Sequence, residues 1–132
     1  MALIDPKPKK NSKPTESELL ILNVLWNKGK ATVREVHETL SEHKDAGYTT
    51  TLKLMQIMFE KGLVNRDDSN KTHIYTANVS KEDTRQQIIG KMINTLFSGS
   101  STQLVMQALG SNEHSTEELE QIQQLLNTLK HK

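Results

Sequence analysis

Apolar residues recur every three or four positions along the first half of the chain, which is the spacing of helices with one buried face. Thr15 and Glu18 begin the first such stretch with the spacing of a capping box, in which each side chain hydrogen-bonds the backbone N–H of the other residue. Thr32 and Glu35 begin the second stretch in the same way. These patterns predict two short amphipathic helices with well-defined N-termini.

A third apolar stretch follows the triplet Thr49-Thr50-Thr51 and stops at Gly62, so we expect a third helix to begin after the triplet. The period then changes. Residues 63–66 and 73–76 favour short β-strands, and residues 67–71 between them are rich in turn formers. Three helices followed by a β-hairpin is the element order of a winged helix-turn-helix domain.

The pattern after residue 78 is helical again. Ser115 and Glu118 form a third capping box, and the last helix then carries a narrow apolar stripe that is typical of a helix–helix seam. The expected fold class is therefore mainly α with a small β-hairpin: a basic arm (1–13), a winged helix-turn-helix domain (14–78) and a C-terminal helical dimerisation domain (79–132). The residues expected at the dimer contact are Ile89, Ile93, Leu96, Leu104, Leu119, Ile122, Leu126 and Leu129.

Composition adds support for a partner subunit. Apolar residues make up 34% of the 132 residues, and with the six glycines the share stays below the ~45–50% usual for soluble globular chains. A small apolar share in a short chain suggests that burial is completed by another subunit. The formal net charge is only +1, so the overall charge does not indicate a nucleic-acid partner. Lysines at positions 7, 9, 10 and 13 suit either sequence-independent attraction to DNA or a solubilising tail.

Several classes of function are excluded or disfavoured. The chain has no cysteine, which removes disulfides and thiolate metal sites. Its five histidines lack metal-ligand spacing, and no phosphate-binding glycine loop or nucleophile motif is present, so we expect neither an enzyme nor a metal or other cofactor. No apolar run approaches the ~18 residues of a membrane span and no secretory signal is recognisable, which predicts a cytoplasmic chain without membrane insertion.

The third helix carries the candidate chemistry. A recognition helix presents short polar donors at the end that enters the major groove, and Thr49, Thr50 and Thr51 fit that role. Lys53 and Gln56 lie farther along, where the amide of glutamine suits adenine and lysine suits guanine or a phosphate. The threonine triplet equally suits a helix N-cap with solvated neighbours.

Other polar residues are candidates for contact with the DNA backbone. Tyr48 is expected against the sugar-phosphate chain, whereas Asp67 and Asp68 are expected to repel it. For the remaining candidates on the second helix and the hairpin, a solvated surface position explains each residue almost as well. These are Arg34, Asn70, Lys71 and His73.

The ordered combination of motifs resembles the BlaI/MecI family of penicillinase repressors over roughly residues 14 to 130. No single motif is specific, but their order along the chain is. The motifs are Thr15-x-x-Glu18 through Leu25-Trp26, Thr32-x-x-Glu35-Val36, Tyr48-Thr49-Thr50-Thr51-Leu52, Glu60-Lys61-Gly62-Leu63-Val64, Ile74-Tyr75-Thr76, Phe97-x-Gly99 and the leucine-rich last helix.

The resemblance implies a homodimer that binds double-stranded DNA at a palindromic operator and represses nearby genes. It also implies release by a membrane-bound sensor with a zinc-protease domain, through cleavage in the dimerisation region. The aligned bond here is Gln107–Ala108 instead of the Asn-Phe of the type members, which implies either different protease specificity or no cleavage. Ile57 stands where the family commonly has arginine, so the operator sequence does not carry over. The paired cysteines of the copper-responsive branch are absent.

A second function remains open from the residues alone. Winged helices also serve as protein-docking modules that bind no specific DNA, because a fold does not determine a function. A docking surface is expected to expose aromatic or aliphatic side chains on the third helix, whereas a DNA-reading surface is expected to be polar there.

Overall fold

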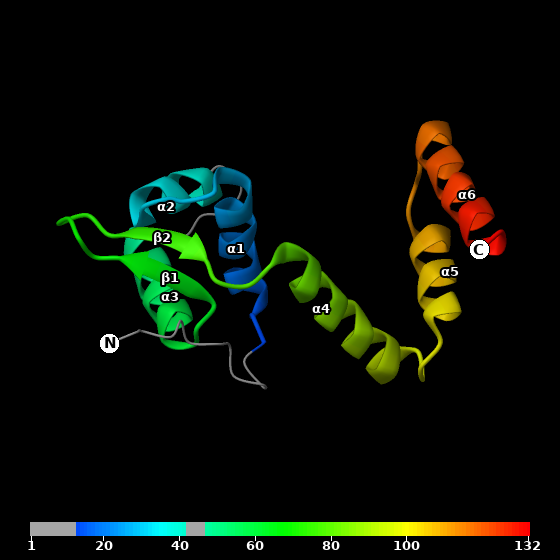
Figure 1. Ribbon diagram of the computed structural model, residues 1–132, viewed down its shortest axis with the longest axis horizontal. Coiled ribbons are helices and arrows are strands. Elements are labelled where there is room, and N and C mark those ends of the chain that lie inside the picture. Colours follow the sequence, from blue (N-terminus) through cyan, green and yellow to red (C-terminus); the bar gives the residue numbers. More distant parts are fainter. Residues whose placement is uncertain (1–12, 42–46) are drawn as a thin grey trace. The chain divides into compact units, whose positions relative to one another are not determined.

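The computed structural model describes residues 13–41 and 47–132, which form six helices and one two-stranded antiparallel sheet (Figure 1). Apart from Lys13, the expected basic arm lies outside the described residues. The first five elements in chain order are α1 (Glu16–Lys28), α2 (Val33–Ser41), α3 (Tyr48–Glu60), β1 (Val64–Asp67) and β2 (Ile74–Ala77). The last three are α4 (Lys81–Leu96), α5 (Ser101–Ser111) and α6 (Thr116–Lys130).

The core of the N-terminal part lies between α1, α2, α3 and the hairpin. α1 contributes Leu22 and Leu25, α3 contributes Met55 and Met58, and β2 contributes Tyr75, all of them fully buried. The helical residues among these lie at the positions where the apolar periodicity predicts buried faces. The order of three helices and a hairpin around this core confirms the predicted fold class, mainly α with a small β-hairpin in a winged helix-turn-helix domain.

The hairpin, which we call the wing (residues 64–77), is tied to the helices by a third segment. Ala31 exchanges two backbone hydrogen bonds with Tyr75, at 2.8 and 3.0 Å, and so extends the sheet on the α2 side. Each strand starts and ends one residue later than the sequence pattern predicts. The reason is the end of α3, where Gly62 adopts a φ of 82° and the Leu63 N–H donates to the Met58 carbonyl, so that Leu63 still belongs to the turn.

The start of α3 also differs from the expectation. The helix begins at Tyr48, with Gly47 at the N-cap position and no side-chain capping bond. The threonine triplet therefore lies inside the first turns of the helix. Because Gly47 occupies the cap, the interpretation of the triplet as an N-cap is wrong.

The N-terminal unit includes the first turn of α4. Contacts divide the chain into an N-terminal unit ending at Arg85 and a C-terminal unit beginning at Gln86, whereas the sequence pattern places the boundary after residue 78. The indole Nε1 of Trp26 donates to the Val79 carbonyl at 2.9 Å, and Thr84 is buried. These contacts keep the segment between β2 and α4 on the winged domain.

A partly buried ion pair joins the beginning of α1 to the end of α3. The Nζ of Lys61 lies 2.7 Å from Oε1 of Glu18, whose side chain is 3% exposed. Glu18 also accepts from the Thr15 backbone N–H at 2.9 Å, as the capping box requires. One carboxylate therefore caps α1 and, through Lys61, holds the C-terminal end of α3.

Lys61→Met is expected to lower the free energy of unfolding by about 1–3 kcal/mol, because the buried Glu18 carboxylate then lacks its cation. Urea denaturation followed by circular dichroism measures this loss. Lys53→Met removes an exposed lysine from α3 and is expected to change stability by less than about 0.5 kcal/mol. Equal losses in the two variants would contradict a stabilising role for the pair.

The C-terminal unit has caps but no core of its own. Ser115 and Glu118 form the predicted capping box at the start of α6, and the Ser115 backbone N–H, by donating to the Glu118 carboxylate, lowers the pKa of that group. Ser98 and Gly99 adopt φ values of 49° and 87° and turn the chain between α4 and α5. From Gln86 to Lys132, all of which the structure describes, no residue is buried. In the described part of the chain, no helix combines the length and apolarity needed to cross a membrane.

Candidate nucleic-acid interface

The solvent face of α3 is polar. Thr49, Lys53 and Gln56 are exposed and share one side of the helix, as their spacing of four and three residues requires, and the exposed Thr50 lies beside them. We call these four residues the recognition face. Thr51 is 2% exposed and packs on the core side with Met55, so its predicted contact with DNA is corrected: its hydroxyl does not face solvent.

Tyr48 is held at the N-terminal end of α3 by two side chains of α2. The Arg34 guanidinium lies 5.7 Å from the centroid of the Tyr48 ring, and the His37 ring meets it edge-on with centroids 5.7 Å apart. Tyr48 is exposed, and it is the one large apolar or aromatic side chain that is exposed within residues 13–41 and 47–85. Tyr48 is thus the single aromatic or aliphatic side chain that α3 exposes, whereas a docking module is expected to expose several such side chains on this helix.

A hollow of about 340 Å³ brings three elements together beside the recognition face. Five of the predicted contact residues line it: Tyr48 and, from three elements, Arg34 of α2, Gln56 of α3, and Lys71 and His73 of the wing. Asn70, another predicted contact residue, is exposed in the turn of the wing. The remaining lining residues are Thr32, Val33, Leu52, Thr72 and Tyr75.

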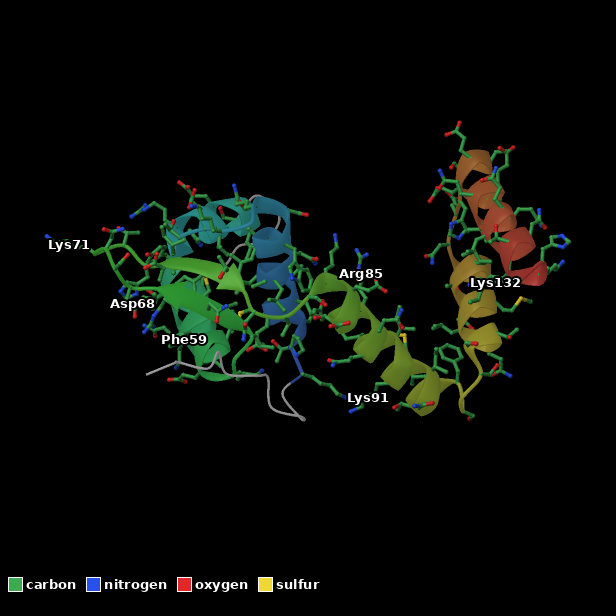
Figure 2. All side chains as sticks on the ribbon, in the orientation of Figure 1. Phe59, Asp68, Lys71, Arg85, Lys91 and Lys132 are labelled. Carbon is green, nitrogen blue, oxygen red and sulfur yellow. The ribbon has the colours of Figure 1, made fainter. Side chains whose placement is uncertain are left out.

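The two acidic residues of the wing are engaged within the protein. Oδ1 of Asp67 accepts from the Ser69 backbone N–H at 2.9 Å, and this bond lowers the pKa of Asp67. Oδ1 of Asp68 lies 2.7 Å from Nε of Arg66 and 3.5 Å from Nδ1 of His73. Figure 2 shows Lys71 projecting from the end of the wing and Asp68 nearer its base. The repulsion expected from Asp68 is therefore offset by its own neighbours.

Arg66 is a residue that the sequence reasoning missed. Its guanidinium lies 4.2 Å from the centroid of the Phe59 ring on α3. The Tyr75 hydroxyl accepts a hydrogen bond from this guanidinium. That bond is the main cause of the raised pKa of Arg66, and the nearby Asp68 carboxylate is the second. The sequence holds one signal for this cluster, the cross-strand register that pairs Arg66 with Tyr75, and that register follows only once the strands are placed.

The C-terminal unit exposes a second candidate surface. Of the residues predicted at the dimer contact, five are exposed, with Leu96 70%, Leu129 53% and Leu126 43% accessible; the other two are Ile89 and Leu119. Ile93, Leu104 and Ile122 are half-buried. Within the described residues, exposure of large apolar side chains on this scale occurs in the C-terminal unit alone.

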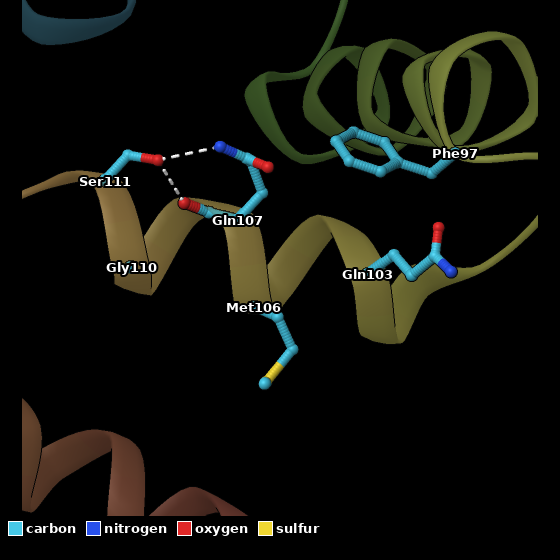
Figure 3. Close-up of a pocket in the computed structure, with 6 residues that line it drawn as sticks. All are labelled: Phe97, Gln103, Met106, Gln107, Gly110 and Ser111. Atoms are coloured by element: carbon cyan, nitrogen blue, oxygen red, sulfur yellow. Dashed lines mark hydrogen bonds between the residues drawn. The ribbon is translucent and has the colours of Figure 1, made fainter.

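The predicted cleavage bond, Gln107–Ala108, lies inside α5, and both residues are exposed. Two side chains one turn later hydrogen-bond the carbonyls of these two residues. Ser111 Oγ donates to the Gln107 carbonyl at 2.6 Å, and Asn112 Nδ2 donates to the Ala108 carbonyl at 3.0 Å. Gln107 also borders a shallow hollow of about 490 Å³ between α5 and Phe97 (Figure 3). The bond is therefore helical and not in the extended form that a protease binds.

No group of three or more histidine or acidic side chains suited to a metal ion occurs within the described residues. His43 lies outside them.

Known proteins resemble this chain along most of its length. A family model described as penicillinase repressor matches residues 14–128. The chain is 21% identical over 112 residues to a penicillinase repressor of Staphylococcus aureus, covering 85% of this chain and 89% of that protein. It is 25% identical over 113 residues to the methicillin resistance regulatory protein MecI of S. aureus strain N315, covering 86% and 92%. A solution structure of the DNA-binding domain of the repressor BlaI aligns with a TM-score of 0.49 at 23% identity, over 55% of this chain and 90% of that one.

Proposed function

Because this chain belongs to the penicillinase repressor family and is therefore a DNA-binding transcriptional repressor and not an enzyme, we propose that it binds a palindromic operator as a homodimer. The observation that carries the proposal is the convergence of three basic side chains on one hollow beside the polar face of α3: Arg34 from α2, Lys71 from the turn of the wing, and His73 directly before β2. A phosphate chain running past this hollow would meet basic side chains of α2 and of the wing beside the helix that reads the bases.

The recognition face reads the major groove in this proposal. Thr49 and Thr50 offer hydroxyl donors and methyl groups for thymine, Gln56 offers an amide for adenine, and Lys53 reaches guanine or a phosphate. Tyr48, at the start of α3, and Asn70, in the turn of the wing, contact the sugar-phosphate backbone. The contacts to the sugar-phosphate backbone fix the position and orientation of the protein on the duplex. The four residues of the recognition face supply the sequence preference.

The C-terminal unit supplies the dimer. Most of its leucines, together with Ile89, are exposed to solvent in the single chain, and pairing with the same surface of a second copy would bury them. Pairing through this unit would set the two recognition faces in successive major grooves, about 34 Å apart or a multiple of it. One winged domain makes few contacts, so tethering two of them raises the affinity for the whole operator.

A fluorescence-anisotropy titration of the full-length chain tests the proposal, with duplexes from its own promoter and with scrambled duplexes over a salt series. The promoter duplex is expected to bind about a thousandfold more tightly than the scrambled one, with affinity falling steeply as salt rises. Equal weak binding to both would remove sequence-specific repression at that promoter. Absence of binding to either at low salt would favour the protein-docking module instead.

Release of repression through a membrane sensor with a metalloprotease domain belongs to the same proposal. Cleavage at Gln107–Ala108 would separate α6 from the rest of the unit and remove most of the exposed leucines from the dimer surface. Because proteases bind extended chains, α5 must first unwind and the bonds from Ser111 and Asn112 must break. Mass spectrometry of the chain from induced cells tests this, and an intact chain during induction would exclude cleavage as the trigger.

A further inference from the structure

Arg66 connects the recognition helix to the wing through three separate contacts. Its guanidinium stacks on Phe59 of α3 at 4.2 Å, hydrogen-bonds the buried Tyr75 of β2, and lies 2.7 Å from Asp68 at the start of the turn. Asp68 in turn lies 3.5 Å from His73, at the other side of the same turn. The chain of contacts therefore runs from α3, through both strands, to the two sides of the turn that carries Lys71.

These contacts leave Arg66 little capacity to bind DNA directly. Its side chain is 23% exposed, and both a ring and a carboxylate already occupy the guanidinium. Residue charge alone would nevertheless make Arg66 a phosphate ligand and Asp68 a repulsive group. The geometry suggests different roles for both residues.

We propose that Arg66 and Asp68 are positioning residues, which clamp the wing against α3 so that Lys71 and His73 face the hollow beside the recognition face. The proposal rests on the proposed DNA-binding function of that face. Arg66 supplies the fixed planar group that bridges Phe59 and the turn, and Asp68 restrains the turn by forming an ion pair with Arg66 on one side and facing His73 on the other.

This role reverses the sign of one expected mutational effect. Loss of an acidic residue from a DNA-facing turn ordinarily strengthens binding, because repulsion from phosphate disappears. If Asp68 holds the wing in place, Asp68→Ala must instead weaken binding, since Lys71 is no longer held near the duplex. Asp68 is half exposed, so the substitution removes the clamp without opening the core.

Asp67→Asn provides the matched control. It removes the same charge from the neighbouring position, and the asparagine oxygen still accepts from the Ser69 backbone N–H. We expect Asp68→Ala to weaken operator binding by about three- to tenfold, and Asp67→Asn to leave it unchanged or strengthen it by about twofold. Arg66→Met, which keeps an apolar contact with Phe59, is expected to match Asp68→Ala in direction.

A double-substitution cycle separates positioning from a general loss of stability. In a Lys71→Ala background the weakening caused by Asp68→Ala is expected to become smaller, because one of the two residues being positioned is gone. Thermal denaturation of each variant checks that the domain remains folded. Tighter binding by Asp68→Ala, or a loss of the same size with and without Lys71, would overturn the proposal.

The two proposals fail in distinguishable ways. If Lys71→Ala leaves operator affinity unchanged, the wing lies away from the duplex and the positioning role of Arg66 is refuted, although α3 can still read the operator. If the unaltered chain binds its promoter no better than a scrambled duplex, the proposed operator function itself fails.

Discussion

Leu126→Glu combined with Leu129→Glu is expected to lower the affinity of the full-length chain for its operator by about a hundredfold or more, because two tethered winged domains become two separate ones. Both side chains are exposed on one side of α6, where pairing would bury them. Glutamate is a good helix former and leaves the Ser115–Glu118 capping box intact, so α6 itself remains helical. Four carboxylates brought into an apolar contact are costly, and the dimer separates.

Sedimentation equilibrium and anisotropy together measure this result. Gln124→Glu with Thr128→Glu is the matched control, since it adds the same charge to α6 on the side away from the leucine stripe. We expect the control to remain dimeric and to bind normally apart from a small electrostatic loss. A leucine variant that becomes monomeric yet binds the whole operator with unchanged affinity would show that the dimer is not required.

Thr50→Ala combined with Lys53→Ala is expected to weaken binding to the operator by roughly 1–3 kcal/mol for each base-reading side chain removed, with little change in binding to scrambled DNA beyond one phosphate charge. Both residues are exposed on α3, and alanine favours helix, so the fold stays intact. The effect therefore appears chiefly as a smaller ratio between the two affinities. The salt dependence separates the part due to the lysine charge.

Lys91→Ala serves as the control for charge, because it removes one exposed lysine from α4 and leaves the recognition face unchanged. We expect it to leave the affinity ratio between operator and scrambled duplex unaltered. If the α3 double variant also keeps that ratio, then other residues read the operator, and the assignment of the recognition face is refuted.

The sequence already contains the residues that the structure brings together around the hollow beside α3. Arg34, Tyr48, Gln56, Lys71 and His73 were each candidates from residue type and element order, and all five line the same hollow. Thr51 was assigned to the wrong side because the helix was expected to start after the triplet. The helix in fact begins at Tyr48, with Gly47 as the N-cap, and this start directs the side chain of Thr51 toward the core.

The contacts that hold these residues in place were not predictable. Lys61 and Glu18 are 43 positions apart, and each belongs to a segment whose own pattern is complete without the other. In the sequence, Arg66 is a basic residue next to two acidic ones, and this pattern is common on protein surfaces. Its stacking on Phe59 and its bond to Tyr75 depend on how β1 crosses the end of α3.

The difference between the two groups of features has a physical cause. Helix periodicity, the three capping boxes and the turn of the wing are interactions within about four positions of the chain, so residue order alone specifies them. The burial of Thr51, the Glu18–Lys61 pair and the Arg66 cluster arise from the packing of α1, α3 and the wing on one core. Their energies depend on distances between segments far apart in the chain, and those distances exist only after the domain has folded.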